Sequence, residues 1–430
     1  MPFPPLSALA RLRAHGRDVL VGLAGFLLPW QTVWLLRAGE LSGQPYALVN
    51  VGIFAGDIVL FALAVFGFIV GTRRSRVTGV IAVLAIAGFG TFNILRSPDV
   101  LLSAVGWVRM ALLVLATTGA GMLARHARAF LYGFLAAMGV HAMIGIVQFL
   151  ALAAPAFTAL GIPERAATRL GESVVEAGGG RWLRAYGGFP HPNVFGTALL
   201  CAIMGTATLL PRAGAALRIR RAIRIAVIAL FTFVLVLTFS RAAWIGAAIL
   251  FGVLAVRPRT QYAALAGALT LLAAFTTLWP LVATRLDTSE RLELISVQQR
   301  YAAIDDAHAL LTAHPLLGVG LHAMPRAIAD VTPARDPATI EPVHDVPVLA
   351  IVEVGVLGMI IVVFALVAAL VASPGFVAPW VWLSLLPAII FDHHPWSLSV
   401  GSVFFIALVA ISVAIATGKQ EGQSQDDGTT

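Results

Sequence analysis

The chain has 430 residues, of which 59% are hydrophobic and only 12% are charged, and its mean hydropathy is +0.90. Soluble domains contain about 25% charged residues, so this composition excludes an ordinary soluble protein and requires a lipid bilayer. The net charge of +8 does not indicate a nucleic-acid partner, because all basic residues except Lys419 are arginines and most lie in short clusters between apolar runs. Such clusters orient membrane helices.

About twelve apolar segments approach the roughly 20 residues that a transmembrane helix needs. They lie near residues 18–36, 47–71, 77–93, 99–123, 128–154, 192–211, 225–240, 242–256, 261–282, 346–372, 376–391 and 397–417. If both termini are cytoplasmic, most arginine clusters also fall on the cytoplasmic side, as the positive-inside rule requires. The sequence therefore predicts an all-α integral membrane protein, with residues 1–430 forming a single polytopic domain.

Two segments on the opposite side, 155–191 and 283–345, are too long to be turns. Long loops in compact domains usually carry function. The larger loop contains an amphipathic helical pattern, so we expect it to form short helices that cap the outer face of the bundle. Residues 418–430 are polar and are predicted to be a disordered cytoplasmic tail.

Several arginines near the outer face are not explained by orientation: Arg181, Arg184, Arg241, Arg285, Arg291 and Arg300. A guanidinium stays charged and offers a fork of donors that suits phosphate oxygens, so a convergent set would suit a diphosphate or another polyanion. The alternative is that these arginines keep the loops soluble or pair with nearby carboxylates. Ser240-Arg241 interrupts a long apolar stretch, where a charge either needs a partner or marks a turn between helices.

Histidines and carboxylates lie at the edges of both long loops. His344-Asp345 closes the larger loop directly before an apolar helix, where an imidazole could act as a general base or could be an exposed loop residue. His191 precedes Pro192 and fits a helix cap. Glu353 lies about two turns into the following helix, and a carboxylate within a span is a candidate functional group.

Asp57 and Arg109 each lie about ten residues from the outer end of an expected helix, which corresponds to a depth of roughly 15 Å for both. Equal depth predicts a buried structural ion pair. Asp392-His393-His394 has the residue types of metal ligands but no third partner at helical spacing, so we expect no metal. Because nucleotide-binding loops are also missing from the sequence, we expect no cofactor and a donor that is not nucleotide-activated.

In order, three stretches resemble the O-antigen ligase and O-antigen polymerase superfamily of bacterial membrane glycosyltransferases. They are RAYGGFPHPN at residues 184–193, LTFSRAAW at 237–244, and HPLLGVG at 314–320 followed by His344 and EVGVLG at 353–358. The N-terminal third agrees only in hydropathy and spacing. The family commonly has His-Asn where this chain has His344-Asp345, and the extra carboxylate would raise the His344 pKa and favour its charged form.

The resemblance implies a GT-C-like helical bundle with a large periplasmic or extracellular loop, in the bacterial inner membrane. It also implies inverting transfer of a glycan from undecaprenyl diphosphate to an acceptor hydroxyl, on lipid A-core or another glycan, lipid or protein, without an obligatory metal. Arg184, Arg241 and Arg300 would hold the diphosphate, and His344 would orient or deprotonate the hydroxyl. The supporting residues would be His191, Asn193, Ser240, Asp345 and Glu353.

Other functions remain open at this point. A Wzy-type polymerase would extend the lipid-linked glycan itself, whereas a ligase would move the glycan to a new acceptor. A secondary transporter could use Asp57, Arg109, His141 and Glu353 as an ion path. Against a transporter, the chain lacks paired Gly/Pro-broken segments in two similar halves and has an unusually long outer loop.

Overall fold

The computed structural model describes residues 6–118, 123–209, 217–257, 260–287, 290–372 and 379–426, and the fold is mostly helical. The helices are α1 (Leu6–Leu27), α2 (Ala55–Val70), α3 (Arg73–Arg96), α4 (Val100–Thr118), α5 (Leu123–Ala151), α6 (Pro192–Thr208), α7 (Leu217–Leu237), α8 (Arg241–Ala255), α9 (Gln261–Thr277), α10 (Trp279–Leu286), α11 (Arg291–Ala313), α12 (Met324–Val331), α13 (Val346–Ala372), α14 (Pro379–Leu383), α15 (Leu386–Phe391), α16 (His394–Ser397) and α17 (Val400–Asp426). The strands form short antiparallel pairs: β1 (Val33–Arg37) with β4 (Val51–Phe54), β2 (Glu40–Leu41) with β3 (Gln44–Pro45), β5 (Ala153–Ala154) with β6 (Arg165–Ala166), and β7 (Val174–Ala177) with β8 (Gly180–Leu183).

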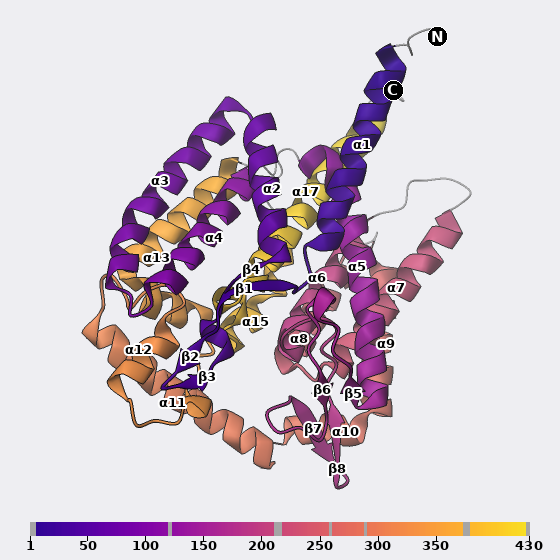
Figure 1. The fold of residues 1–430 in the computed structure, drawn as a ribbon. Coiled ribbons are helices and arrows are strands. Elements are labelled where there is room, and N and C mark those ends of the chain that lie inside the picture. The colour runs from indigo at the N-terminus through magenta and orange to yellow at the C-terminus, as the bar shows by residue number, and fades with distance from the viewer. Residues whose placement is uncertain are drawn as a thin grey trace.

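The bundle has two distinct ends (Figure 1). The first and last helices and the turn between α2 and α3 lie at one end, whereas β7, β8, α10 and α11 lie at the other. The segment 155–191 folds into β6, β7 and β8 with connecting turns, and 283–345 contains the second half of α10 and all of α11 and α12. Both long loops therefore gather at the end opposite the chain termini. Helix α17 runs through Asp426, so most of the predicted disordered tail is helical, and residues 427–430 lie outside the described residues.

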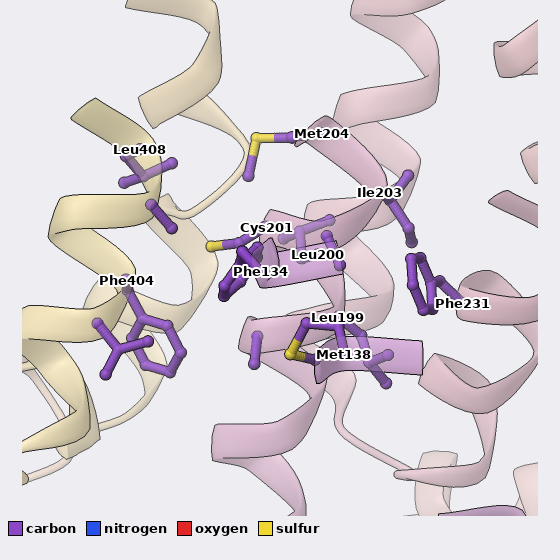
Figure 2. Close-up of a cluster of buried hydrophobic side chains, with 14 of the residues drawn as sticks. Phe134, Met138, Leu199, Leu200, Cys201, Ile203, Met204, Phe231, Phe404 and Leu408 are labelled. Carbon is purple, nitrogen blue, oxygen red and sulfur yellow. The ribbon is translucent and has the colours of Figure 1, made fainter. Parts of the chain in front are cut away.

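Helix α6 forms the centre of the bundle. All of its residues except Asn193 and Thr208 are buried, and it packs against α5, α7, α8 and α17. Figure 2 shows side chains of α6 among those of α5, α7 and α17; the labelled residues are Phe134, Met138, Leu199, Leu200, Cys201, Ile203, Met204, Phe231, Phe404 and Leu408. Because protein surrounds it on all sides, its length is not set by the bilayer thickness, and its N-terminus is held at the middle of the outer end.

The number of spans differs from the predicted twelve. In the described parts of the chain, four helical segments are long and apolar enough to cross a membrane, Arg73–Arg96, Val100–Thr118, His126–Ala151 and Val346–Val371. A fifth is counted if α9 and the helical segment that follows it, bent by 91°, form one broken span. Other apolar helices have 10–17 residues, which is shorter than the roughly 20 that a straight span needs.

Two predicted helices at the N-terminal side are partly wrong. The predicted segment 18–36 ends as a helix at Leu27, just before Pro29, and continues as strand β1. The predicted segment 47–71 becomes helical only at Ala55, because residues 51–54 form β4 against β1. A short apolar run fits a strand as well as a helix, and the pairing partner decides which one forms.

Helix α13 is broken at Gly355, which has φ 67° and ψ 175°. The segment 314–320 lies against this break: Val319 N–H donates to the Val352 carbonyl at 3.0 Å, and Val356 N–H donates to the Pro315 carbonyl at 3.0 Å. A Cβ at Gly355 would lie 2.2 Å from the Leu316 oxygen, so this position requires glycine. The HPLLGVG and EVGVLG stretches of the sequence are therefore two halves of one structural contact that fixes the break within α13.

Candidate active site

Four arginines from separate elements gather at the end of the bundle that carries both long loops. Arg184 follows β8, Arg241 is the first residue of α8, Arg285 lies in the last turn of α10, and Arg300 lies within α11. Their charges act on one another, since the charge of Arg241 lowers the pKa of both Arg184 and Arg300. Three of the four were predicted from the sequence to bind a diphosphate.

Arg184 is buried and held by neutral oxygens. Its Nε donates to the Thr238 carbonyl at 2.7 Å, and its Nη2 donates to Asn193 Oδ1 at 2.6 Å. Burial lowers the pKa of Arg184 to about 10, so the guanidinium stays charged at neutral pH. These two hydrogen bonds fix the orientation of the guanidinium. Neither acceptor is a carboxylate, so neither bond neutralises the charge of Arg184.

Arg241 and Arg285 share one carboxylate. Glu293, whose side chain is 2% exposed, lies 2.9 Å from Arg241 Nη2 and also accepts a hydrogen bond from Arg285. Arg285 Nε donates to the Phe239 carbonyl at 3.3 Å. Ser240 caps α8 by accepting from Ala243 N–H at 3.4 Å, and this cap sets the position of Arg241. The charge on Arg241 is thus paired with Glu293, but Arg285 shares the same carboxylate.

Arg300 is the unpaired arginine of the site. Within the described ranges it makes no hydrogen bond and no ion pair, and its Nε is buried. Burial lowers its pKa, the charge of Arg241 lowers it further, and the charges of Asp392 and Glu341 raise it. Among the described residues, these four guanidinium groups have two buried carboxylates near them, Glu293 and Asp392, and the partly exposed Glu341, so the surplus of positive charge suits a polyanionic ligand.

His344 lies near Arg300, and its ring makes no hydrogen bond among the described residues. Nδ1 is buried without a hydrogen-bond partner in the described part of the chain, and Nε2 lies 3.8 Å from Glu341 Oε2. Burial lowers the pKa of His344, against the opposing charges of Asp392 and Glu341. The imidazole is therefore neutral at neutral pH, as a general base must be.

The predicted effect of Asp345 on His344 is wrong. The Asp345 carboxylate accepts a hydrogen bond from Val348 N–H at 2.9 Å and so caps the N-terminus of α13. It is engaged with the helix end, and the carboxylates whose charge raises the His344 pKa are Asp392 and Glu341. Burial outweighs both, so the shift has the opposite sign to the predicted one.

Asp392 connects this histidine to α6. Asn193 Nδ2 donates to Asp392 Oδ2 at 2.7 Å, and the same amide accepts from Arg184. Burial alone raises the pKa of Asp392, but the imidazoles around it, chiefly His394, hold it well below its usual range. A continuous chain of polar contacts therefore runs from Arg184 through Asn193 to Asp392. Asn193 and Asp392 are 199 positions apart in the sequence.

His191 supports this chain rather than taking part in proton transfer. It is the N-cap of α6; its Nδ1 accepts from Asn193 N–H at 3.1 Å, and its Nε2 lies 2.9 Å from Ser173 Oγ. Because both ring nitrogens are occupied, His191 positions Asn193. This role follows from Pro192 at the first helical position, which places His191 at the cap.

His344, Asp392 and His393 form a compact group whose potential ligand atoms lie within 4.8 Å of one another. The rings of His344 and His393 are perpendicular, with centroids 4.9 Å apart. By residue type these groups could hold a divalent cation. Two features oppose it: Asp392 already accepts from Asn193 and from His393 N–H, and Arg300 contributes positive charge beside the group.

Glu353 lies outside the arginine group. It is 1% exposed and accepts from Trp396 Nε1 at 2.7 Å and from His322 N–H at 2.9 Å. Asp57 and Arg109 form an ion pair through two hydrogen bonds of 2.9 and 2.8 Å. Asp57 lies in the first turn of α2, because that helix begins only at Ala55, whereas Arg109 is the tenth residue of α4.

Some site residues were not predicted as such. Arg285 was recognised only as an unexplained outer arginine, and Glu293 only as a possible partner for such arginines. Asp392 and His393 were noticed but set aside because no third ligand lay at helical spacing. The third group, His344, is 48 positions earlier than Asp392 in the sequence, so spacing along one helix could not reveal it.

Residues 226–363 match the family model described as O-antigen ligase. The resemblance seen in the sequence is confirmed. The O-antigen ligase match includes Arg241, Arg300 and His344, whereas Arg184 and Asp392 lie outside it and join the site through Asn193. No curated protein matches the chain. The apolar helices indicate a multi-pass membrane protein, and the family whose model matches residues 226–363 is glycosyltransferase-like.

Proposed function

We propose that this protein transfers a glycan from undecaprenyl diphosphate to an acceptor hydroxyl, on lipid A-core or a similar acceptor, at the outer face of the inner membrane. The observation that carries the proposal is a neutral imidazole, His344, which makes no hydrogen bond among the described residues and lies near a surplus of guanidinium charge that includes Arg300. A glycosyl transfer from a lipid diphosphate needs both a base for the acceptor and cations for the leaving group.

In the proposed reaction, the acceptor oxygen attacks the anomeric carbon and the bond from that carbon to the phosphate oxygen breaks. The acceptor proton passes to His344, and the leaving group is undecaprenyl diphosphate. Arg184, Arg241 and Arg300 stabilise the negative charge that develops on the diphosphate. One displacement inverts the anomeric centre. No step needs a metal ion, since the guanidinium groups carry the compensating charge.

The test is reconstitution in detergent with a lipid-linked oligosaccharide and candidate acceptors. Wild-type protein should transfer the glycan, and Arg184→Ala, Arg241→Ala and His344→Ala should each reduce the rate strongly. Glu341→Ala is the matched control for His344, because Glu341 lies 3.8 Å away but has no assigned step. If His344→Ala stays folded and transfers at the wild-type rate, the assignment of the base is wrong.

Two alternatives give different products. Glycan on a new acceptor indicates a ligase, and a longer chain still attached to undecaprenyl diphosphate indicates a Wzy-type polymerase. Transfer in detergent, where no ion gradient exists, excludes an ion-coupled transporter as the explanation. The contacts of Glu353 and the Asp57–Arg109 pair favour an enzyme over a transporter, because these charges are engaged in fixed hydrogen bonds.

A further inference from the structure

An open apolar groove runs along α8 and α9 and has a volume of about 570 Å³. Its lining includes Ala248 and Gly252 on α8 and Leu265, Leu272 and Phe275 on α9. Leu265 and Leu272 are 57% and 62% exposed, so the groove opens away from the protein core. Gly252 has no atom within 4 Å of the position where a Cβ would lie, which leaves free space at the groove floor.

The groove is continuous with the arginine group. Helix α8 begins with Arg241, and the groove begins at Ala248, seven residues or about 10 Å further along the same helix. At that end, the ring of Phe275 lies 4.8 Å from that of Trp244, which in turn lies 6.1 Å from Phe239. The Phe239 carbonyl accepts from Arg285, so contacting side chains join the groove to the cationic site.

We propose that this groove holds the polyprenyl tail of the lipid-diphosphate donor, an inference that rests on the proposed function. The donor is an amphiphile whose charged head and apolar chain are covalently joined. When the arginines hold the diphosphate, the chain must leave the site along an apolar surface within a few isoprene units. The α8–α9 groove starts about 10 Å along the helix from Arg241, and apart from Gln261 its lining is apolar, which suits a hydrocarbon chain.

The first experiment fills the groove. Gly252→Leu adds a side chain into the free space, and Gly88→Leu is the matched control, since Gly88 on α3 is also exposed with no atom within 4 Å of its Cβ position but lies outside the groove. For a full-length undecaprenyl donor, Gly252→Leu should raise KM about tenfold and leave kcat nearly unchanged. For a donor whose tail has only one or two isoprene units, the two variants should behave alike, because such a tail is too short to occupy the groove.

The second experiment measures binding without turnover. Undecaprenyl diphosphate that carries a diazirine in the middle of its chain is photolysed with the protein, and the labelled peptides are mapped. Labelling of α8 and α9 that unlabelled undecaprenyl diphosphate blocks, and phosphatidylethanolamine does not, supports the proposal. Equal blocking by both lipids, or labelling confined to other helices, overturns it and leaves the groove as an ordinary lipid-facing surface.

The two failures can be told apart. If wild-type protein transfers no glycan from any lipid-linked donor, the proposed function fails. If wild-type protein is active but Gly252→Leu and Gly88→Leu have the same KM for the full-length donor, only the groove assignment fails. Thermal unfolding of both variants in detergent checks that neither substitution has disturbed the bundle.

Discussion

Arg300 gives the sharpest prediction, because its removal should affect activity and stability in opposite directions. Arg300 makes no ion pair or hydrogen bond among the described residues and is repelled by Arg241. Arg300→Gln therefore removes no hydrogen bond or ion pair of the described residues, and the loss of its attraction to Asp392 and Glu341 is offset by relief of its repulsion from Arg241 and of its burial cost. We expect the unfolding temperature to stay the same or to rise slightly.

The effect on catalysis should be large. A hydrogen bond to a charged group contributes about 1.5–3 kcal/mol, which corresponds to a fall in kcat/KM of about 10- to 150-fold if Arg300 contacts the diphosphate in the transition state. The assay is the initial rate of glycan transfer in detergent, together with thermal unfolding of the same sample. Both measurements are made on wild type and variant under identical conditions.

A matched control lies in the same cap. Arg335 donates to Asp306 at 2.6 Å and so already has a carboxylate partner. Arg335→Gln should leave kcat/KM unchanged and should lower stability by at most about 1 kcal/mol. The reasoning is refuted if Arg300→Gln lowers the unfolding temperature by several degrees while kcat/KM stays at the wild-type value, since Arg300 would then be a structural residue.

Three further outcomes are expected. Burial lowers the pKa of His344 below 6.5, so a base at this position stays neutral as the pH falls to 6.5 and kcat/KM should decline only below that value; an inflection above 6.5 contradicts this. Glu293→Gln leaves Arg241 and Arg285 without their shared carboxylate and should lower the unfolding free energy by about 3–5 kcal/mol, measured by thermal unfolding, whereas an unchanged midpoint would show that the pair contributes little. Treatment with EDTA should not reduce the transfer rate, because guanidinium groups supply the charge; a loss that added Mn²⁺ or Zn²⁺ restores would instead assign the His344, Asp392 and His393 group to a metal.

Part of the fold follows directly from hydropathy. The apolar segments predicted as helices mostly contain helices. The count of spans does not follow, since α6 is an apolar helix that is buried in protein and need not match the bilayer. Hydropathy measures the preference of a segment for an apolar surrounding, and the interior of a bundle satisfies that preference as well as lipid does.

The resembling stretches show a second limit. HPLLGVG and EVGVLG were considered together with His344 as candidate functional motifs, but in the structure they hold each other at the break in α13. Glu353 accepts hydrogen bonds from Trp396 and from the backbone of His322. A sequence pattern of glycines and a carboxylate looks the same whether these residues bind a substrate or fix the conformation of a loop.

The sequence by itself determined that this is a membrane protein, and it predicted that arginines beyond those needed for orientation lie on the side of the long loops and that His344 ends the larger loop. Tertiary structure decided which of these charges are already neutralised. Asn193 meets Asp392, Arg241 meets Glu293, and Arg300 meets no partner in the described chain. The physical reason is that a site depends on net charge and free hydrogen-bonding capacity, and both are set by contacts between residues that only the packing around α6 brings together.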